Sequence, residues 1–331
     1  MQDHSMTGMN TTEKTGVQLR TSMGLTVDCF PFSKRPKTAF EFLEYSHSLG
    51  AGGVEAPLGS LDADNIRRIR QRVETLGMYL EPWATLPKGD ASAFEQTVRA
   101  AKEAGARCLR AFCLGGRRYE VFQDRAQWKQ FVAESRASLQ MALPVLERHK
   151  MVLGLENHKD WTLEEMLALM REFGGEYLGV CLDTGNNIAL LDDTIELTER
   201  LAPYAVSVHL KDIAGAEYEE GFLNVEVPLG QGMLDIKRIV DAIRRARPHV
   251  KFTLEMMTRS PLKIPCLSPG YWATFPDRMG YALARTLRTI RQNPPRRPLP
   301  EVEKLEPAAR LQLEEDNVRE CILYAKQHLD L

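Results

Sequence analysis

The sequence predicts an α/β protein built as a single (β/α)8 barrel, followed by a C-terminal helical extension. Eight short β-rich runs recur along the chain, and an amphipathic helical pattern follows each of them. Most of the successive run ends lie 26 to 29 residues apart. Strands that alternate with helices in this way favour parallel βα units.

The predicted strands end, in chain order, at Asp28, Glu55, Trp83, Phe112, Glu156, Asp183, His209 and Glu255. Small or polar residues alternate with aliphatic residues within them: Ser207, His209 and Lys211 share one strand face, opposite Val206 and Val208. Side chains of a strand point to opposite faces with period two. We therefore expect the aliphatic face to pack against helices and the polar face to line the barrel lumen.

The predicted organisation has three parts: a polar tail at 1–20, the barrel at 21–293 with its last helix near 278–291, and a Pro-rich connector with a final helix at 294–331. Apolar residues at helical spacing in the final helix are Val318, Cys321, Ile322, Ala325 and Leu329. This face either packs on its own barrel or forms a homo-oligomer contact. A doubly wound open sheet is disfavoured, because no Gly-rich phosphate loop follows the first strand.

Composition narrows the range of partners and locations. The chain has 331 residues, a formal net charge of -2 and a pI near 6.4, which gives no basic surface for nucleic acid. The six cysteines show no CxxC spacing, as expected for reduced thiols in the cytoplasm. No signal-peptide pattern and no run long enough to span a bilayer occur, so we expect a cytoplasmic enzyme with a small-molecule substrate.

Four consecutive strand ends carry groups that bind metal ions: Glu156, Asp183, His209 and Glu255. In a parallel barrel, functional groups gather where the strands end, so these four side chains are predicted to converge. Several carboxylates in a lumen are very costly without a cation. Three carboxylates and one imidazole suit one divalent ion, of which Mn²⁺, Mg²⁺, Co²⁺ and Zn²⁺ are the candidates.

The pieces GLENH, CLDTGN, VHLKD, LGQG and TLEM follow one another between about Gly24 and Arg291. With these motifs the chain resembles the xylose isomerase-like TIM barrels, which include ketose 3-epimerases, inosose isomerases and dehydratases, dehydroshikimate dehydratases and AP endonucleases. The resemblance transfers the family's metal ligands onto the four strand-end residues. Asn186 stands where many ketose epimerases carry a histidine. An endonuclease of the family needs several more histidines at strand ends. Here only His158 and His209 lie at such places, so DNA repair is disfavoured.

The resemblance implies a metal, most simply Mn²⁺, that holds adjacent carbonyl and hydroxyl oxygens of a keto-sugar. Glu156 and Glu255 are then the predicted base and acid of an isomerase or epimerase that works through an enediolate. A metal-dependent lyase or dehydratase that eliminates next to a ketone is the alternative, which Asn186 and Lys211 keep open. A non-catalytic sugar-binding barrel is a third hypothesis.

Two further residues are predicted to take part in catalysis. Lys211 is a donor to the developing oxyanion, or a base if desolvation lowers its pKa. Its alternative role is an ion pair with Glu55 or Asp183. His158 is predicted to contact a substrate hydroxyl or to shuttle a proton, and the alternative is a cap on the next helix.

Substrate-binding roles are predicted for Glu81, Trp83, Arg110, Asn186 and Arg259. The first three lie on strands three and four, where they form a polar and aromatic mouth. Residues 256–276 after the eighth strand form either a lid or a packed excursion. In the first case, Lys263, Tyr271 and Trp272 join Arg259 in covering the substrate. A second long rim loop is expected at 213–232.

Overall fold

The computed structural model describes residues 20–32, 36 and 38–331, so all but the last residue of the predicted tail lies outside the described residues. Its barrel strands are β1 (Gly24–Thr26), β2 (Gly53–Glu55), β3 (Tyr79–Glu81), β4 (Leu109–Ala111), β5 (Leu153–Glu156), β6 (Leu178–Asp183), β7 (Ala205–Leu210) and β10 (Phe252–Leu254). They pair in parallel in the order β3-β2-β1-β10-β7-β6-β5-β4. A parallel bridge between Trp83 and Arg110 links the two edge strands, and the predicted barrel is confirmed.

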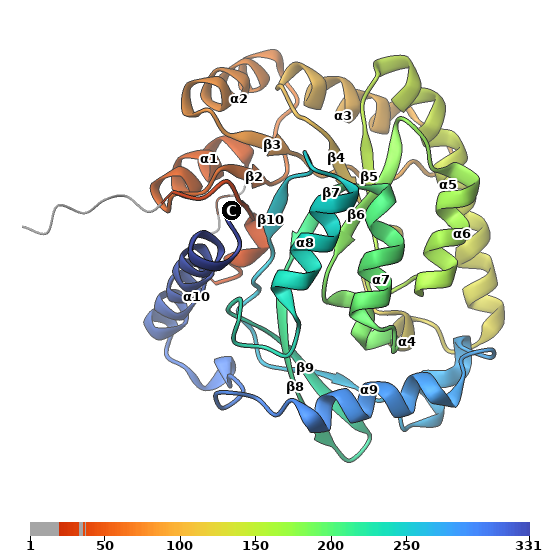
Figure 1. The fold of residues 1–331 in the computed structure, drawn as a ribbon. Coiled ribbons are helices and arrows are strands. Elements are labelled where there is room, and N and C mark those ends of the chain that lie inside the picture. Colours follow the sequence, from red (N-terminus) through yellow and green to blue (C-terminus); the bar gives the residue numbers. More distant parts are fainter. Residues whose placement is uncertain (1–19, 33–35, 37) are drawn as a thin grey trace, which may run out of the picture.

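Helices surround this sheet (Figure 1). Those between the barrel strands are α1 (Ala39–Ser48), α2 (Ala63–Leu76), α3 (Ser92–Glu103), α4 (Arg118–Val121), α5 (Arg125–His149), α6 (Leu163–Phe173), α7 (Thr194–Leu201) and α8 (Ile236–Ala246). Two more follow the last strand, α9 (Gly280–Gln292) and α10 (Pro307–His328). None of the helices in the described part combines the length and apolar character that crossing a bilayer requires.

Small residues on the inner face let the strands close around the site. A Cβ atom on Gly154 of β5 would lie 2.9 Å from the Ser207 hydroxyl and 3.1 Å from the Cys181 Cβ. The lumen therefore has no room for a larger side chain at this level. The strand ends above it are free to carry the long polar groups, as the alternation in the sequence predicts.

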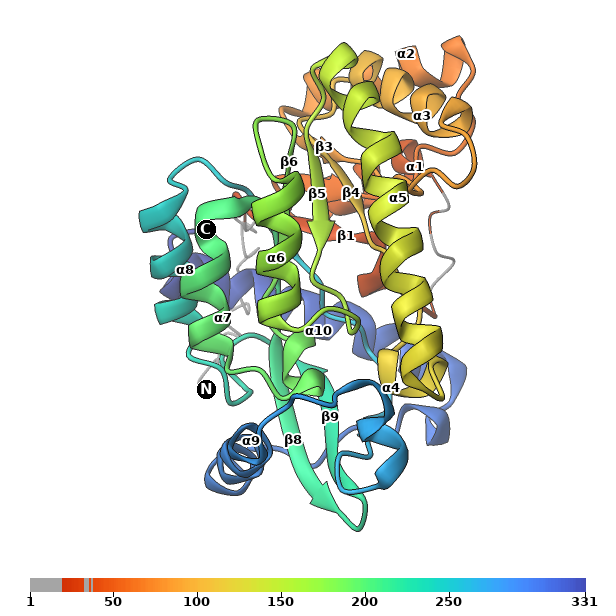
Figure 2. The ribbon, with the colours of Figure 1, turned by 90° about the vertical axis from the view of Figure 1, so that its right-hand side faces the viewer.

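The segment expected as a rim loop at 213–232 is instead a β-hairpin, β8 (Asp212–Tyr218) with β9 (Gly221–Val227). Residues 256–276 add a third antiparallel strand to it, β11 (Leu262–Ile264). Helix α9 packs on this hairpin rather than on the barrel wall. Buried residues of this second core include Ile213, Phe222, Ile264, Tyr271, Leu287 and Ile290. Figure 2 shows the hairpin and α9 at the end of the barrel toward which β5 points.

Helix α10 takes the place of the eighth barrel helix, between α1 and α8 (Figure 1). Its predicted apolar face is buried in the main core. The Leu229 amide donates to the Cys321 sulfur at 3.4 Å, and Arg244 of α8 donates to the Leu329 carbonyl at 2.6 Å. The face proposed for a subunit contact is thus covered by the chain's own barrel. The expectation that residues 278–291 supply the last barrel helix is wrong, because that helix covers the hairpin.

We predict that Ile322→Ala lowers the free energy of unfolding by about 2–4 kcal/mol, because it removes a buried side chain from the α10 interface. The neighbouring Leu323, which is 40% exposed, is the matched control, and Leu323→Ala should change it by less than about 0.5 kcal/mol. Urea denaturation followed by circular dichroism measures both. Equal effects would show that α10 contributes little to the barrel.

Candidate metal centre and active site

The four predicted metal ligands meet at one point at the mouth of the barrel. They come from the adjacent strands β5, β6 and β7 and from the residue directly after β10. One ligand atom from each of Glu156, Asp183, His209 and Glu255 lies within 4.8 Å of the others, and all four residues are buried. The convergence of consecutive strand ends thus occurs as the sequence predicts.

The donor chemistry of this cluster fits a divalent cation. Each member turns a buried atom toward the cluster, and among the described residues these atoms make ion-pair contacts but no hydrogen bond of regular geometry; they are Glu156 Oε2, Asp183 Oδ2, His209 Nδ1 and Glu255 Oε2. Three carboxylates gathered away from water repel one another and lose hydration, and a cation offsets both costs. Oxygen donors with one imidazole nitrogen suit Mg²⁺, Mn²⁺, Co²⁺ or Zn²⁺.

Glu55 fixes the orientation of the histidine. Its Oε2 lies 2.6 Å from His209 Nε2, and this leaves Nδ1 facing the cluster, 2.7 Å from Glu255 Oε2 and 3.7 Å from Glu156 Oε1. A carboxylate on the outer nitrogen of a metal-binding histidine holds the ring and its tautomer. Glu55 also accepts the indole N–H of Trp83 at 2.8 Å. The sequence marks Glu55 as a strand end but gives no sign of this partner.

We predict that Glu55→Gln weakens metal binding by about 10- to 100-fold, because the amide is a poorer partner for the His209 ring. Glu81 on β3 lies opposite Glu55 in register and is the matched control. It contacts Arg107 rather than the cluster, so Glu81→Gln should leave metal affinity unchanged. Competition with a fluorescent chelator measures both variants. Wild-type affinity in folded Glu55→Gln would remove the orienting role.

Arg110 and Asn186 hold Glu156 from two sides. The Arg110 guanidinium forms an ion pair with Glu156 Oε2, and the Asn186 amide donates to Glu156 Oε1 at 3.1 Å. Burial alone would raise the pKa of Glu156, but Arg110 and His209 hold it below the usual range. Both predicted substrate-binding residues therefore lie beside the candidate base.

Lys211 reaches the same cluster. Its Nζ lies 2.8 Å from Asp183 Oδ2, 3.1 Å from Glu255 Oε2 and 3.9 Å from Glu226 Oε1. Of the two predicted ion-pair partners, Asp183 is the one in contact. Burial would lower the pKa of Lys211, but Asp183 and Glu255 raise it above the usual value. The ammonium is thus suited to stabilise negative charge, and a pKa lowered by desolvation is not found.

An aromatic surface borders the cluster. The His158 ring stacks on Phe112 at a centroid distance of 5.6 Å, and the Arg110 guanidinium lies over the rings of Phe112 and Trp83 at 4.7 and 5.5 Å. Burial lowers the pKa of His158 to about 3, so its ring is neutral at neutral pH. Phe112 is 38% exposed, and its position two residues after Arg110 could have identified it.

Glu81 faces the lumen as predicted, but it does not join this surface. Its Oε1 accepts from Arg107 at 2.9 Å, and its Oε2 lies 3.4 Å from the Thr253 hydroxyl. Arg107 also donates to the carbonyl of Val206, near the start of β7. Glu81 therefore belongs to a layer below the strand ends. The alternation of side chains along a strand predicts which face of the sheet a side chain lies on, but it does not predict how deep in the barrel the side chain lies.

Residues 256–276 are packed in place rather than poised as a free lid. Tyr271 is buried, and its hydroxyl donates to the Ala189 carbonyl at 2.8 Å; the Trp272 indole donates to the Cys266 carbonyl at 3.0 Å. The Arg259 guanidinium forms two hydrogen bonds with the Glu226 carboxylate. Tyr271 is thus not available to cover a sugar ring.

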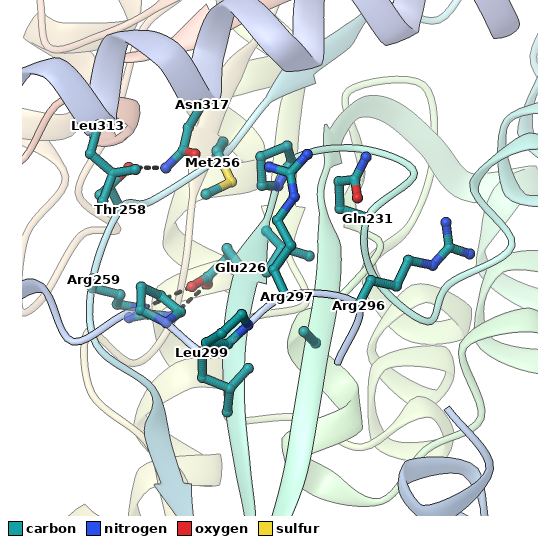
Figure 3. Close-up of a pocket in the computed structure, with 15 residues that line it drawn as sticks. Glu226, Gln231, Met256, Thr258, Arg259, Arg296, Arg297, Leu299, Leu313 and Asn317 are labelled. Carbon is teal, nitrogen blue, oxygen red and sulfur yellow. Dashed lines mark hydrogen bonds and ion pairs between the residues drawn. The ribbon is translucent and has the colours of Figure 1, made fainter. Parts of the chain in front are cut away.

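Arg259 and Glu226 line a pocket between the hairpin, residues 296–300 and α10 (Figure 3). None of the four predicted ligands lines this pocket. Glu226 connects this pocket with the cluster of candidate metal ligands, because its carboxylate contacts Arg259 and lies 3.9 Å from Lys211 Nζ. Among the described residues, the contact that links Arg259 to the cluster of candidate metal ligands therefore runs through Glu226. Glu226 could not be recognised as a site residue from the sequence, since it lies in the hairpin that was expected to be a loop.

Comparison with known proteins agrees with this architecture. The family profile described as xylose isomerase-like TIM barrel matches residues 43–274. A 3-oxo-isoapionate decarboxylase of Pectobacterium atrosepticum is 30% identical over 220 residues, which cover 64% of this chain and 75% of that protein.

Two solved structures show the same fold. A D-psicose 3-epimerase determined in the presence of D-fructose has a TM-score of 0.61 at 14% identity, over 93% of this chain and 99% of its own. A xylose isomerase-like TIM barrel protein from Mycobacterium smegmatis in complex with magnesium has a TM-score of 0.55 at 13% identity, over 82% and 99%.

Proposed function

Because the chain belongs to the xylose isomerase-like TIM barrel family, we propose that it is a divalent-metal-dependent isomerase or epimerase of a keto-sugar or a related polyol ketone. The observation that carries the proposal is the buried cluster of Glu156, Asp183, His209 and Glu255. A bound divalent ion would polarise adjacent carbonyl and hydroxyl oxygens and stabilise the negative charge of an enediolate. Mn²⁺ is our first choice, and the magnesium in the mycobacterial neighbour supports a divalent ion in general.

The side chains of the site have separate roles in this proposal. Glu156 and Glu255 come from strands on opposite flanks of β6 and β7, so one removes the proton next to the carbonyl and the other returns it. Lys211 donates to the oxygen on which negative charge develops. Trp83 and Phe112 offer flat apolar surfaces to the sugar, and Arg110 and Asn186 orient Glu156. His158 contributes a neutral ring to a substrate hydroxyl.

A second candidate is decarboxylation of a 3-oxo sugar acid, which the 30% identical relative favours. Loss of CO₂ from a carbon next to a ketone leaves the same kind of electron pair as proton removal does. The pair moves onto the ketone oxygen, and a proton returned to carbon completes the reaction. The same cluster therefore serves both candidates, and only the leaving group differs. Elimination of water next to a ketone is the remaining lyase alternative.

One experiment separates the candidates. Metal-loaded protein is incubated in D₂O with a panel of ketoses, inososes, 3-keto-glycosides and 3-oxo sugar acids. A product that carries deuterium on carbon and has no other change in mass identifies an isomerase or epimerase. Release of CO₂ or of water identifies a lyase. No exchange and no turnover with any member of the panel, in protein that binds the metal, would contradict the enediolate proposal.

We place the enzyme in the cytoplasm, acting on a small-molecule substrate rather than on nucleic acid. All six cysteines are free, and five of them are buried. Free thiols are typical of a reducing compartment. A net charge of -2 gives no general attraction for a polyanion.

A further inference from the structure

Lys159 is a buried cation that the sequence analysis did not single out. It lies three residues after Glu156, is 5% exposed, and donates from Nζ to Asn186 Oδ1. Among the described residues, no carboxylate lies within 4.0 Å of its ammonium group. A buried lysine without an anionic partner is costly, so an ammonium at this place calls for a partner.

The same amide oxygen serves a second lysine. Lys211 Nζ lies 3.4 Å from Asn186 Oδ1, so two ammonium groups share one acceptor. The other end of the amide donates to Glu156 Oε1 at 3.1 Å, and this fixes which way Asn186 points. Burial, together with the charges of Lys211 and Arg259, lowers the pKa of Lys159 to about 8. The two like charges thus lie side by side at the edge of the metal cluster.

A count of the charges in the site shows that the lysine pair, Lys159 and Lys211, lacks one negative charge. The ion pairs of the site join three permanent cations and five carboxylates, which are Arg110, Lys211 and Arg259 with Glu55, Glu156, Asp183, Glu226 and Glu255. His209 is counted as neutral because a metal ligand is an unprotonated imidazole, and the buried Asp160 is counted as protonated because burial raises its pKa to about 8. A divalent ion held by the cluster balances this set. Lys159 then remains as one surplus positive charge. A ligand with a single negative charge restores neutrality in a buried site, where imbalance is expensive.

We propose that Lys159 and Lys211 form a subsite for the carboxylate of the substrate, so that the enzyme acts on a keto-sugar acid. This inference rests on the proposed metal-dependent function and names its substrate class. A carboxylate carries one negative charge and matches the surplus, whereas a phosphate monoester carries about -1.5 to -2 at neutral pH. The subsite adjoins Glu156 and Asp183, which sets the carboxylate close to the ketone that the metal would hold.

In such a substrate the carboxylate is a binding handle and, in a 3-oxo acid, also the leaving group. The bond between the carboxylate and the adjacent carbon breaks, CO₂ departs, and the electron pair passes to the ketone oxygen. One proton then adds to carbon, so that the carboxylate and one proton give the ketone and CO₂ with no oxidant or reductant. The subsite therefore serves either candidate function, an isomerase of a keto-sugar acid or the decarboxylase, and only the decarboxylase releases the carboxylate.

Calorimetric titration of the Mg²⁺-loaded full chain tests the subsite. The probes are tartronate, which has carboxylates beside a hydroxyl, neutral dihydroxyacetone, and dihydroxyacetone phosphate. Lys159→Met should weaken tartronate binding by about 10- to 100-fold, as expected for loss of a charge-assisted hydrogen bond, and should not affect dihydroxyacetone. Lys159→Arg should retain most of the affinity. Lys263→Met, at an exposed lysine on β11, is the matched control and should behave like wild type.

Magnesium affinity is measured first for each variant. Failure of the wild type to bind magnesium contradicts the proposed function itself, whereas metal-loaded Lys159→Met that binds tartronate like wild type overturns only the subsite. If Lys159→Met weakens the binding of dihydroxyacetone phosphate but not that of tartronate, the carboxylate assignment is overturned. Lys159→Gln provides a second test if the Met variant fails to fold, as judged by thermal melting.

Discussion

Treatment with EDTA is expected to lower turnover by about 1000-fold or more, and Mn²⁺ or Co²⁺ should restore it. A cation that withdraws negative charge from a carbonyl oxygen lowers the activation barrier by about 4 kcal/mol or more, which corresponds to this factor in rate. Oxygen-rich donors discriminate weakly among such ions, so more than one metal should work. The measurement is the initial rate before and after chelation, with metal content determined by elemental analysis.

Asp183→Asn is the variant that goes with this experiment. Asp183 Oδ1 accepts from the amides of Gly185 and Asn186 at 2.8 and 2.7 Å, and an asparagine oxygen can still do so. The substitution removes the negative charge while keeping that turn, so metal affinity should fall. It also removes the buried ion pair of Asp183 Oδ2 with Lys211, so the melting temperature should fall as well, and metal content is compared in protein shown to be folded. Full activity in protein that is shown to contain no metal would contradict the assignment of the centre.

Glu156→Gln and Glu255→Gln should each reduce kcat by about 100-fold or more at saturating metal, because each removes a positioned acid or base. Saturation with metal matters, since both residues are also proposed ligands. Glu81→Gln is the control within the lumen, because its partner Arg107 lies outside the cluster. Single-turnover rates separate chemistry from product release.

An asymmetric result would also be informative. If only one of the two variants loses the chemical step, then the other glutamate is at most a ligand. A decarboxylase needs an acid to return a proton but no base to remove one, so near-normal CO₂ release in one variant would agree with the carboxylate subsite at Lys159. Near-normal turnover in both variants would rule out either glutamate as an acid or base.

The barrel and the cluster of candidate metal ligands could be predicted because they depend on local, repeated patterns. A strand end fixes where Glu156 and His209 lie along the barrel, and parity fixes the face, so the convergence follows from connectivity alone. The depth of Glu81 could not be obtained in this way, because it depends on Arg107, which enters the lumen from the opposite end. Lys159 was missed for a similar reason, since its partner Asn186 belongs to the next βα unit.

The mouth was harder to predict than the wall of the barrel. The hairpin β8–β9 and the strand β11 lie outside the repeating βα order, so their pairing has no signal in the spacing of the units. Arg259 looks like a lid residue in the sequence because it begins a Pro-rich excursion that contains Pro261, Pro265 and Pro269. Its ion pair with Glu226 is a contact between residues 33 positions apart, and only the folded chain reveals it.

Helix α10 has a consequence for biosynthesis. Strand β1, near the beginning of the chain, pairs with β10, and the helix that covers their neighbourhood is made only when residues 307–328 have left the ribosome. Domains that fold during translation need all of their core elements outside the exit tunnel. Until then, the nascent barrel presents an uncovered apolar seam. We therefore expect the last folding step to follow translation of α10 and the nascent chain to bind chaperones at this seam.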